Sequence, residues 1–182
     1  MKTRTQAKLE NILLPLARPL NINPNILTIF SVLSTLGSAY YILKFELVAA
    51  SALFFIGALL DALDGLVARE HSRATKLGAF LDKTADRAND GVILLAIVLG
   101  GYVEPVIGLA AFFFIFLASY MSEAIDALSG KKIAEAISFR PIRSAVVFLG
   151  LLFGYVAPAV WVLLFIGLWT TLYRLFKAKW LL

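Results

Sequence analysis

Four aspartates lie inside stretches of the sequence that are otherwise apolar enough to form membrane helices. They are Asp61, Asp64, Asp82 and Asp86. The first two are three residues apart and the last two are four apart, so each pair shares one face of a helix. A carboxylate near the middle of a bilayer costs about 2.5–3.5 kcal/mol on insertion scales, so four of them require a cation to hold. Because Arg69, Arg73 and Lys76 follow the first pair and precede the second, the stretch predicts a metal site beside a phosphate-binding rim.

The composition is that of an integral membrane protein. Of the 182 residues, 60% are hydrophobic and 16% are charged, against about a quarter charged in soluble proteins, and the mean hydropathy is +0.85. No long polar segment separates the apolar stretches, so we expect a single domain over residues 1–182. The polar, basic start of the chain is not typical of a secretory signal, and the absence of cysteine excludes disulfides and thiolate chemistry.

The hydropathy pattern predicts an all-α integral membrane protein, in which six transmembrane helices follow an N-terminal amphipathic helix at the membrane interface. The interfacial helix is expected over residues 3–20, where apolar side chains recur at helical spacing. The six spans are expected at about 26–43, 47–69, 76–99, 103–125, 142–157 and 159–177. At a rise of 1.5 Å per residue, Asp61 and Asp86 both lie roughly 12–15 Å from the basic loop, so the two pairs are expected to meet at one depth.

The basic residues indicate how the chain sits in the membrane. They cluster before residue 26, over 69–76, over 131–143 and over 174–179, and these clusters fall on one side of the expected spans. By the positive-inside rule, both termini and the aspartate-bearing end face the cytoplasm, in the cell membrane. Because these residues line a membrane face, anionic lipid headgroups are their expected partners, and nucleic acid is not.

The aspartate stretch also fits a spaced motif, D-x2-D-G-x2-A-R-x8-G-x3-D-x3-D. Its eight positions are filled by Asp61, Asp64, Gly65, Ala68, Arg69, Gly78, Asp82 and Asp86. This pattern resembles the signature of the CDP-alcohol phosphotransferases, which are integral membrane enzymes of phospholipid synthesis. The motif covers 26 residues, and the six-span layout resembles the family over nearly the whole chain.

The resemblance implies a reaction and a set of roles. Enzymes of this family transfer the phosphoryl-alcohol part of a CDP-linked donor to an acceptor hydroxyl and release CMP. The four aspartates would bind one or two Mg²⁺ or Mn²⁺ ions, which prefer oxygen ligands, and Asp86 would also act as the general base. The positions that match the family's nucleotide contacts are Pro24, Asn25, Ile26, Leu27, Asp61, Gly65, Ala68, Arg69, Thr75 and Gly78.

A second basic group suggests the acceptor. It consists of Lys131, Lys132, Arg140, Arg143 and Arg174. A small site rich in arginine suits a dianionic phosphate, and this layout is similar to the phosphatidylinositol-phosphate and archaetidylinositol-phosphate synthases. The resemblance therefore implies inositol phosphate as acceptor, a CDP-linked lipid as donor and a homodimer.

Three alternatives stay open at the level of sequence. A phosphatidylglycerophosphate-type synthase would also need a basic pocket, and a transferase that uses soluble CDP-inositol would carry the same motif. An alternative of another class is a cation or proton transporter that uses the same intramembrane aspartates.

Overall fold

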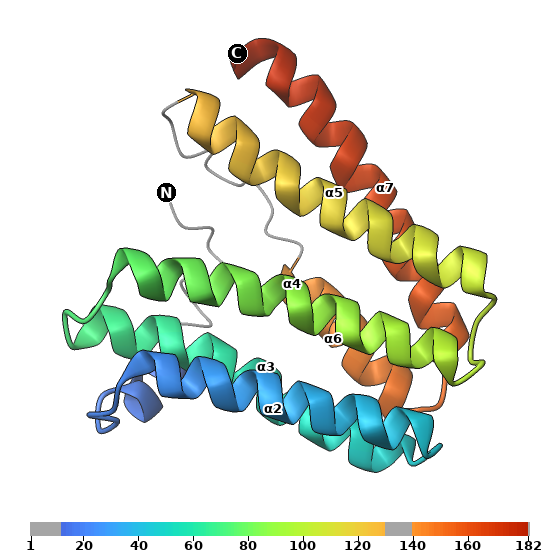
Figure 1. Cartoon of the computed structure of the whole chain (residues 1–182), viewed down its shortest axis with the longest axis horizontal. Helices are drawn as coiled ribbons and strands as arrows, with labels where there is room; N and C mark the ends of the chain where they lie inside the picture. Colours follow the sequence, from blue (N-terminus) through green and yellow to red (C-terminus); the bar gives the residue numbers. More distant parts are fainter. Residues whose placement is uncertain (1–11, 130–139, 182) are drawn as a thin grey trace.

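The computed structural model describes residues 12–129 and 140–181, and these residues form helices and connecting loops with no strand. A short helical segment over residues 12–17 precedes six longer helices (Figure 1). These are α2 (Pro24–Leu43), α3 (Leu47–Glu70), α4 (Lys76–Leu99), α5 (Pro105–Ser129), α6 (Arg140–Leu152) and α7 (Val156–Leu181). The prediction of an all-α fold is confirmed.

Four of the described helices are long and apolar enough to cross a membrane, namely α2, α3, α5 and α7. Helix α4 has 24 residues, but its first half carries the second aspartate pair and several cations. The described part of helix α6 has 13 residues and is about 20 Å long, whereas the hydrocarbon core of a bilayer is roughly 30 Å thick. The chain is an integral membrane protein, and its apolar helices are its membrane-embedded part.

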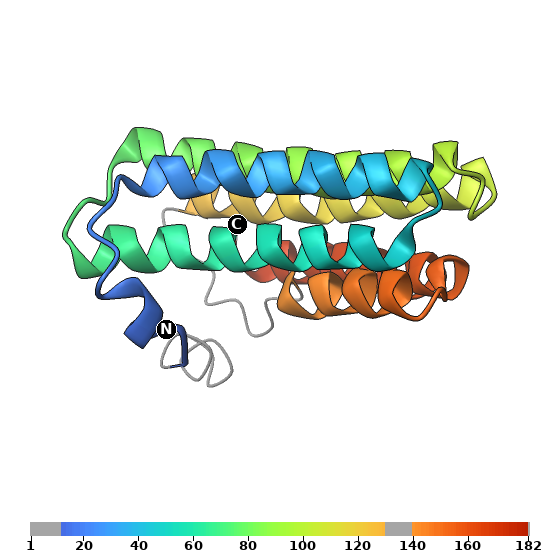
Figure 2. The same ribbon diagram turned by 90° about the horizontal axis from the view of Figure 1, so that it is seen from below.

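The helices pack in a ring. Helix α2 contacts α3 and α4, α3 contacts α6, α6 contacts α7, α7 contacts α5, and α5 contacts α4. In Figure 1, α2, α3 and α4 form one group and α5 and α7 another, and Figure 2 shows α6 lying beside α7. The main core lies inside the ring, where Ile42, Ile93, Leu151 and Leu163 are almost completely buried.

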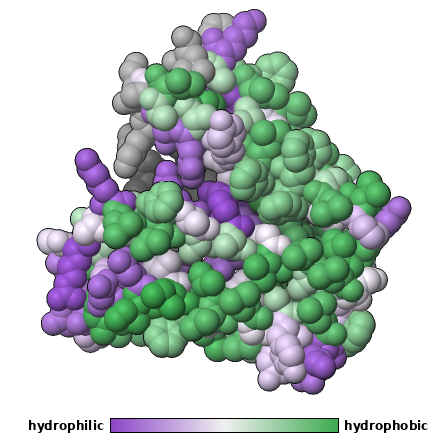
Figure 3. All heavy atoms as spheres, in the orientation of Figure 1, coloured by the Kyte–Doolittle hydropathy of each residue, from purple (hydrophilic) through white to green (hydrophobic). Residues whose placement is uncertain are grey.

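Small residues let α2 and α3 approach each other closely. A Cβ added to Gly57 would lie 3.2 Å from both the Ser31 carbonyl oxygen and Thr35 Oγ1. Ser38 is fully buried and donates a hydrogen bond to the Ala50 carbonyl at 2.8 Å. Small side chains at helix crossings are the usual basis of tight packing in membranes. Apolar side chains cover most of the outer face in Figure 3, and hydrophilic ones gather in the hollow between α4 and α5.

Several helix limits differ from the expected spans. Helix α2 begins at Pro24, two residues before the expected start of the first span, because the Asn23 side chain caps this helix and Pro24 occupies its first position. The helix expected over 103–125 runs from Pro105 to Ser129.

The expected boundary between the last two spans is wrong by several residues. Helix α6 ends at Leu152 and α7 begins at Val156, where the prediction placed the break near residue 158. The chain turns at Gly154, whose φ of 75° is readily adopted only by glycine. Pro158 lies in the first turn of α7, where its missing N–H removes no helical hydrogen bond.

The expected interfacial helix over 3–20 is observed only in part. Its described portion is helical over 12–17, and residues 3–11 lie outside the described residues. Ala17 is fully buried and packs with Leu27, Leu63 and Val67 in a small second core. The segment is therefore docked on α2 and α3, near the end of the bundle that carries the first aspartate pair.

We expect Gly150→Ala to destabilise the protein, because α6 and α7 are too close for another methyl group. A Cβ on Gly150 would lie 2.5 Å from the Cβ of Ala159, and overpacking of this kind costs about 1–3 kcal/mol. The measurement is the thermal unfolding midpoint of the detergent-solubilised protein. Adding Ala159→Gly removes the opposing methyl, so the double variant should lose less stability than the two single variants together. Strictly additive losses would contradict this account of the contact.

Candidate functional site

Three of the four aspartates form one compact cluster. Asp61 and Asp64 come from α3 and Asp82 comes from α4, and one carboxylate oxygen of each lies within 4.8 Å of the others. Asp64 is only 3% exposed, and the Oδ1 atom of Asp61 is buried with no hydrogen-bond partner. A cluster of hard oxygen donors with an unsatisfied buried oxygen fits Mg²⁺ or Mn²⁺.

Helix α2 holds this cluster together although it contributes no ligand. It packs against both α3 and α4, and its Thr28 is buried beside Asp64. Thr28 Oγ1 lies 2.5 Å from Asp64 Oδ2 and 3.4 Å from the Pro24 carbonyl oxygen. The hydroxyl has one proton, and the shorter contact to a charged acceptor takes it. Thr28 therefore orients Asp64. This residue was not predicted from the sequence, because a threonine in an apolar helix carries no distinctive pattern.

Asp86 lies beside the cluster and is paired with an arginine. Nη2 of Arg140, from α6, lies 2.9 Å from Asp61 Oδ2 and also contacts Asp86 Oδ1. One turn further along α6, Arg143 Nη2 lies 3.4 Å from Asp90 Oδ2. The structure thus brings Asp61, Asp64 and Asp82 together as predicted and places Asp86 next to them, with the Arg140 guanidinium bridging the two pairs.

Five of the predicted nucleotide positions form two local groups. Thr75 caps α4, its Oγ1 accepting a hydrogen bond from Gly78 N at 2.9 Å. A Cβ on Gly78 would lie 3.2 Å from Asn25 Oδ1, so the first turns of α2 and α4 touch. On α3, a Cβ on Gly65 would lie 3.2 Å from Arg69 Nη1. The side chains of Asn25, Thr75 and Arg69 thus occupy the space beside the two glycines.

The remaining predicted nucleotide positions differ in exposure. Leu27 is 5% exposed and its side chain belongs to the small core, while Ile26 is largely exposed. Pro24 is buried and Ala68 is half-buried. Arg73 fixes the loop between α3 and α4, donating hydrogen bonds to the Ile22 carbonyl and to Asn21 Oδ1 at 3.1 and 2.7 Å.

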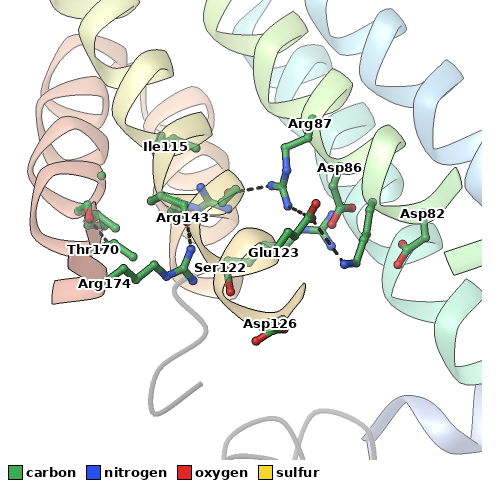
Figure 4. Close-up of a pocket in the computed structure, with 16 residues that line it drawn as sticks. Asp82, Asp86, Arg87, Ile115, Ser122, Glu123, Asp126, Arg143, Thr170 and Arg174 are labelled. Carbon is green, nitrogen blue, oxygen red and sulfur yellow. Dashed lines mark hydrogen bonds and ion pairs between the residues drawn. The ribbon is translucent and has the colours of Figure 1, made fainter. Parts of the chain in front are cut away.

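A cavity of about 300 Å³ opens next to Asp86, between α4, α5, α6 and α7. Five cationic side chains line it, and they are Lys83, Arg87, Arg140, Arg143 and Arg174. In Figure 4, Arg87 and Arg174 enter the cavity from opposite sides. Three of the five were predicted for an acceptor pocket, while the other two predicted residues, Lys131 and Lys132, lie outside the described residues.

Two cations of this cavity, Lys83 and Arg87, were not predicted from the sequence. Lys83 and Arg87 each follow an aspartate of the second pair, so the helix turns them about 100° away from the metal cluster and toward α5. Arg87 Nη1 donates to Ser119 Oγ at 2.9 Å, and Glu123 Oε1 lies 3.6 Å from Arg87 Nη2 and 3.7 Å from Lys83 Nζ. Arg174 Nη1 donates to the Ala118 carbonyl. Four carboxylates, those of Asp82, Asp86, Glu123 and Asp126, also line the cavity, so cations exceed anions by one, and we call it the cationic chamber.

The described helices of this membrane protein combine a site for a divalent metal with a neighbouring cationic chamber. This combination is typical of a metal-dependent transferase of phosphate-bearing groups. A family model described as CDP-alcohol phosphatidyltransferase matches residues 21–173. The chain therefore belongs to the CDP-alcohol phosphatidyltransferase family, and it is a transferase. Family membership together with the aspartate cluster confirms the expected dependence on Mg²⁺ or Mn²⁺. Family membership also favours a transferase over the cation or proton transporter, an alternative that the aspartates alone do not exclude.

Two curated relatives match over most of the chain. The chain is 33% identical over 160 residues to the archaetidylinositol phosphate synthase of Pyrococcus horikoshii, covering 88% of this chain and 85% of that protein. It is also 33% identical over 172 residues to the phosphatidylinositol phosphate synthase of Corynebacterium glutamicum, covering 87% of this chain and 78% of that protein.

Among solved structures, the chain is similar to phosphatidylinositol phosphate synthase of Mycobacterium tuberculosis. The structure of that enzyme with CDP-DAG bound has a TM-score of 0.76 and 26% sequence identity, covering 92% of this chain and 94% of that one. A second structure of the same enzyme, in complex with manganese and citrate, has a TM-score of 0.77 and 25% identity, covering 91% and 88%.

We expect Thr28→Val to weaken metal binding, because valine keeps the shape of the side chain and removes the hydroxyl that orients Asp64. Loss of such a supporting hydrogen bond typically costs about 10–100-fold in metal affinity or activity. The measurement is the Mg²⁺ concentration that gives half-maximal CMP release. Thr28→Ser should restore most of the affinity. Thr35→Val is the matched control, because Thr35 is also buried on α2 but donates to the Ser31 carbonyl, away from the aspartates. Equal effects at both threonines would assign Thr28 a general packing role.

Proposed function

We propose that the chain transfers the phosphoryl-alcohol part of a CDP-linked lipid to inositol phosphate and releases CMP. The observation that carries this proposal is the position of the cationic chamber, which opens directly beside Asp86 and the aspartate cluster. The names of the relatives support it, since they are archaetidylinositol and phosphatidylinositol phosphate synthases. The CDP-DAG bound to the related mycobacterial enzyme supports a lipid donor.

The chamber has the chemistry of a site for a small phosphorylated polyol. Arginine guanidinium groups bind a phosphate dianion through paired hydrogen bonds, and Arg87, Arg143 and Arg174 all line the chamber. On the α5 wall, Ser122 and Glu123 can exchange hydrogen bonds with hydroxyl groups. A volume of about 300 Å³ is at the small end of ligand sites, which favours a compact acceptor over a second lipid.

The donor would lie across the aspartate cluster from the acceptor. Its nucleotide would contact the predicted positions Asn25, Gly65, Arg69, Thr75 and Gly78, and its lipid chains would extend along the apolar outer surface. Asp61, Asp64 and Asp82 would hold the cation, and Asp86 would complete the set of four carboxylates. A bound Mg²⁺ or Mn²⁺, one ion or two, supplies charge that offsets the diphosphate of the donor.

The reaction is then a direct displacement at phosphorus. The acceptor hydroxyl oxygen forms a bond to the phosphorus that carries the lipid alcohol, and the bond from this phosphorus to the bridging diphosphate oxygen breaks. CMP leaves with that oxygen. Asp86 lies between the cluster and the chamber, so it is placed to take the proton of the attacking hydroxyl. The chamber arginines hold the acceptor phosphate and so aim the hydroxyl at the donor.

We further propose that the chain is one domain over residues 1–182 with six transmembrane helices, in which α4 crosses as part of the ring and the 13 described residues of α6 form part of the fifth span. The charges of α4 that would oppose insertion face the chamber and the cluster, which supports its crossing. The active site and both termini would face the cytoplasm, as the basic clusters indicate. A homodimer is proposed from the family resemblance.

We expect Asp86→Asn to reduce turnover by at least about 100-fold, because a carboxamide cannot accept the acceptor proton and general bases typically contribute about 10²–10⁴-fold. The assay is Mg²⁺-dependent release of CMP from a CDP-linked lipid and inositol phosphate. Binding of CDP, followed by calorimetry, should change little. Glu104→Gln, in the loop before α5, serves as control. Turnover that survives in Asp86→Asn, or that persists after chelation of divalent ions, would contradict the proposed roles.

We expect Arg143→Ala to raise the KM for inositol phosphate roughly 10–100-fold, as fits the loss of about 1.5–3 kcal/mol from a charged hydrogen bond. The KM for the CDP-lipid should change far less, because Arg143 lines the chamber and not the nucleotide region. Initial rates measured against each substrate separate the two effects. Lys44→Ala, after the end of α2, removes a positive charge away from the chamber and should alter neither value. Equal increases in both KM values for Arg143→Ala would exclude a specific acceptor pocket.

A further inference from the structure

Arg140 belongs to two sites at once. Its guanidinium lies against Asp61 and Asp86, with 2.9 Å between Nη2 and Asp61 Oδ2, and the same side chain lines the cationic chamber. Its side chain is 34% exposed, while the side chains of Asp61 and Asp86 are 12% and 9% exposed. The arginine therefore reaches from the open chamber into the more enclosed aspartate site.

This position conflicts with the cation that the aspartates are built to hold. Asp61 is shared, because it is one of the three residues whose oxygens lie within 4.8 Å of one another, and it is also a partner of Arg140. A guanidinium and a divalent cation bound to the same carboxylate repel each other at short range. Binding of the cation therefore favours withdrawal of Arg140 from Asp61, and the chamber is the space that the side chain already borders.

We infer that Arg140 is an internal counter-ion that couples the metal site to the acceptor site. Without the cation, its guanidinium balances the charge of Asp61 and Asp86. With the cation bound, it turns into the chamber and joins the groups that hold the acceptor's phosphate. Here the inference rests on the proposed function, which assigns the chamber to a phosphorylated acceptor.

A thermodynamic consequence follows from this exchange. If an anion in the chamber draws Arg140 away from Asp61, it also removes the competitor of the cation. Anion and cation must then strengthen each other's binding by the same factor. An enzyme of this kind assembles its metal site fully only when the acceptor is present.

Arg143 provides a matched comparison. It lies one turn from Arg140 on the same helix, lines the same chamber and carries the same charge. Its partner is Asp90, at 3.4 Å, and Asp90 is not part of the three-aspartate cluster. A general electrostatic effect would weaken with distance but act through both arginines, whereas direct competition for Asp61 is specific to Arg140.

The test is Mn²⁺ binding to the purified, detergent-solubilised full chain, followed by the electron paramagnetic resonance signal of the free ion and without any substrate. We expect R140Q to bind Mn²⁺ about tenfold more tightly than the wild type. This factor corresponds to a wild-type protein in which Arg140 is paired with Asp61 in about nine-tenths of the molecules. We expect R143Q to stay within about threefold of the wild type. Equal tightening in both variants, or no tightening in R140Q, would overturn the inference.

A second measurement does not depend on the folding of any variant. Inorganic phosphate, added to the wild-type protein, should tighten Mn²⁺ binding by about fivefold or more after correction for direct association of the two ions in protein-free buffer. R140Q should lose this response. Unchanged Mn²⁺ affinity in the presence of phosphate would overturn the coupling. Because neither measurement uses inositol phosphate or turnover, a failure of the proposed acceptor would appear only in the CMP assay and would leave these results standing.

Discussion

The burial of carboxylates among apolar helices is the constraint around which this structure is built. Asp64 is 3% exposed and Asp86 is 7% exposed, so water can do little to solvate either of them. An unpaired charge in such a place is strongly unfavourable, and it must be met by hydrogen bonds, by an ion pair or by a bound cation. The hydrogen-bond donor Thr28 comes from α2 and the ion-pair partner Arg140 from α6, so satisfying the aspartates of α3 and α4 links four helices.

The two most buried aspartates are satisfied in different ways, and the difference matches their proposed roles. Asp64 accepts a hydrogen bond from Thr28, a neutral group that fixes the carboxylate and leaves its charge available to a cation. Asp86 faces the guanidinium of Arg140, a charged group that borders the chamber. In the proposed roles, the metal ligand Asp64 is oriented by a hydroxyl, while the general base Asp86 is paired with a side chain of the chamber proposed for the acceptor.

The aspartate site could be predicted from the sequence because its geometry is local. Spacings of three and four residues place each pair on one helical face, and the short loop before Lys76 returns the second pair to the depth of the first. Contacts between residues that are far apart in the sequence leave no spacing pattern of this kind. The pairing of Arg140 with Asp61 depends on how α6 packs against α3, and the Thr28 hydroxyl is one of many in apolar helices. The end of α6 was misplaced because hydropathy does not register the backbone conformation of Gly154.

The position of Arg140 on α6 explains how one side chain can serve two sites. Arg140 contacts Asp61 and Asp86, so this part of α6 lies at the level of the aspartates. Arg143 follows one turn later on the same helix and lines the chamber together with Arg140. An arginine placed a full span away from the aspartates would reach neither of them. The packing of α6 against α3 and α7 therefore brings the same pair of arginines to the aspartates and to the chamber.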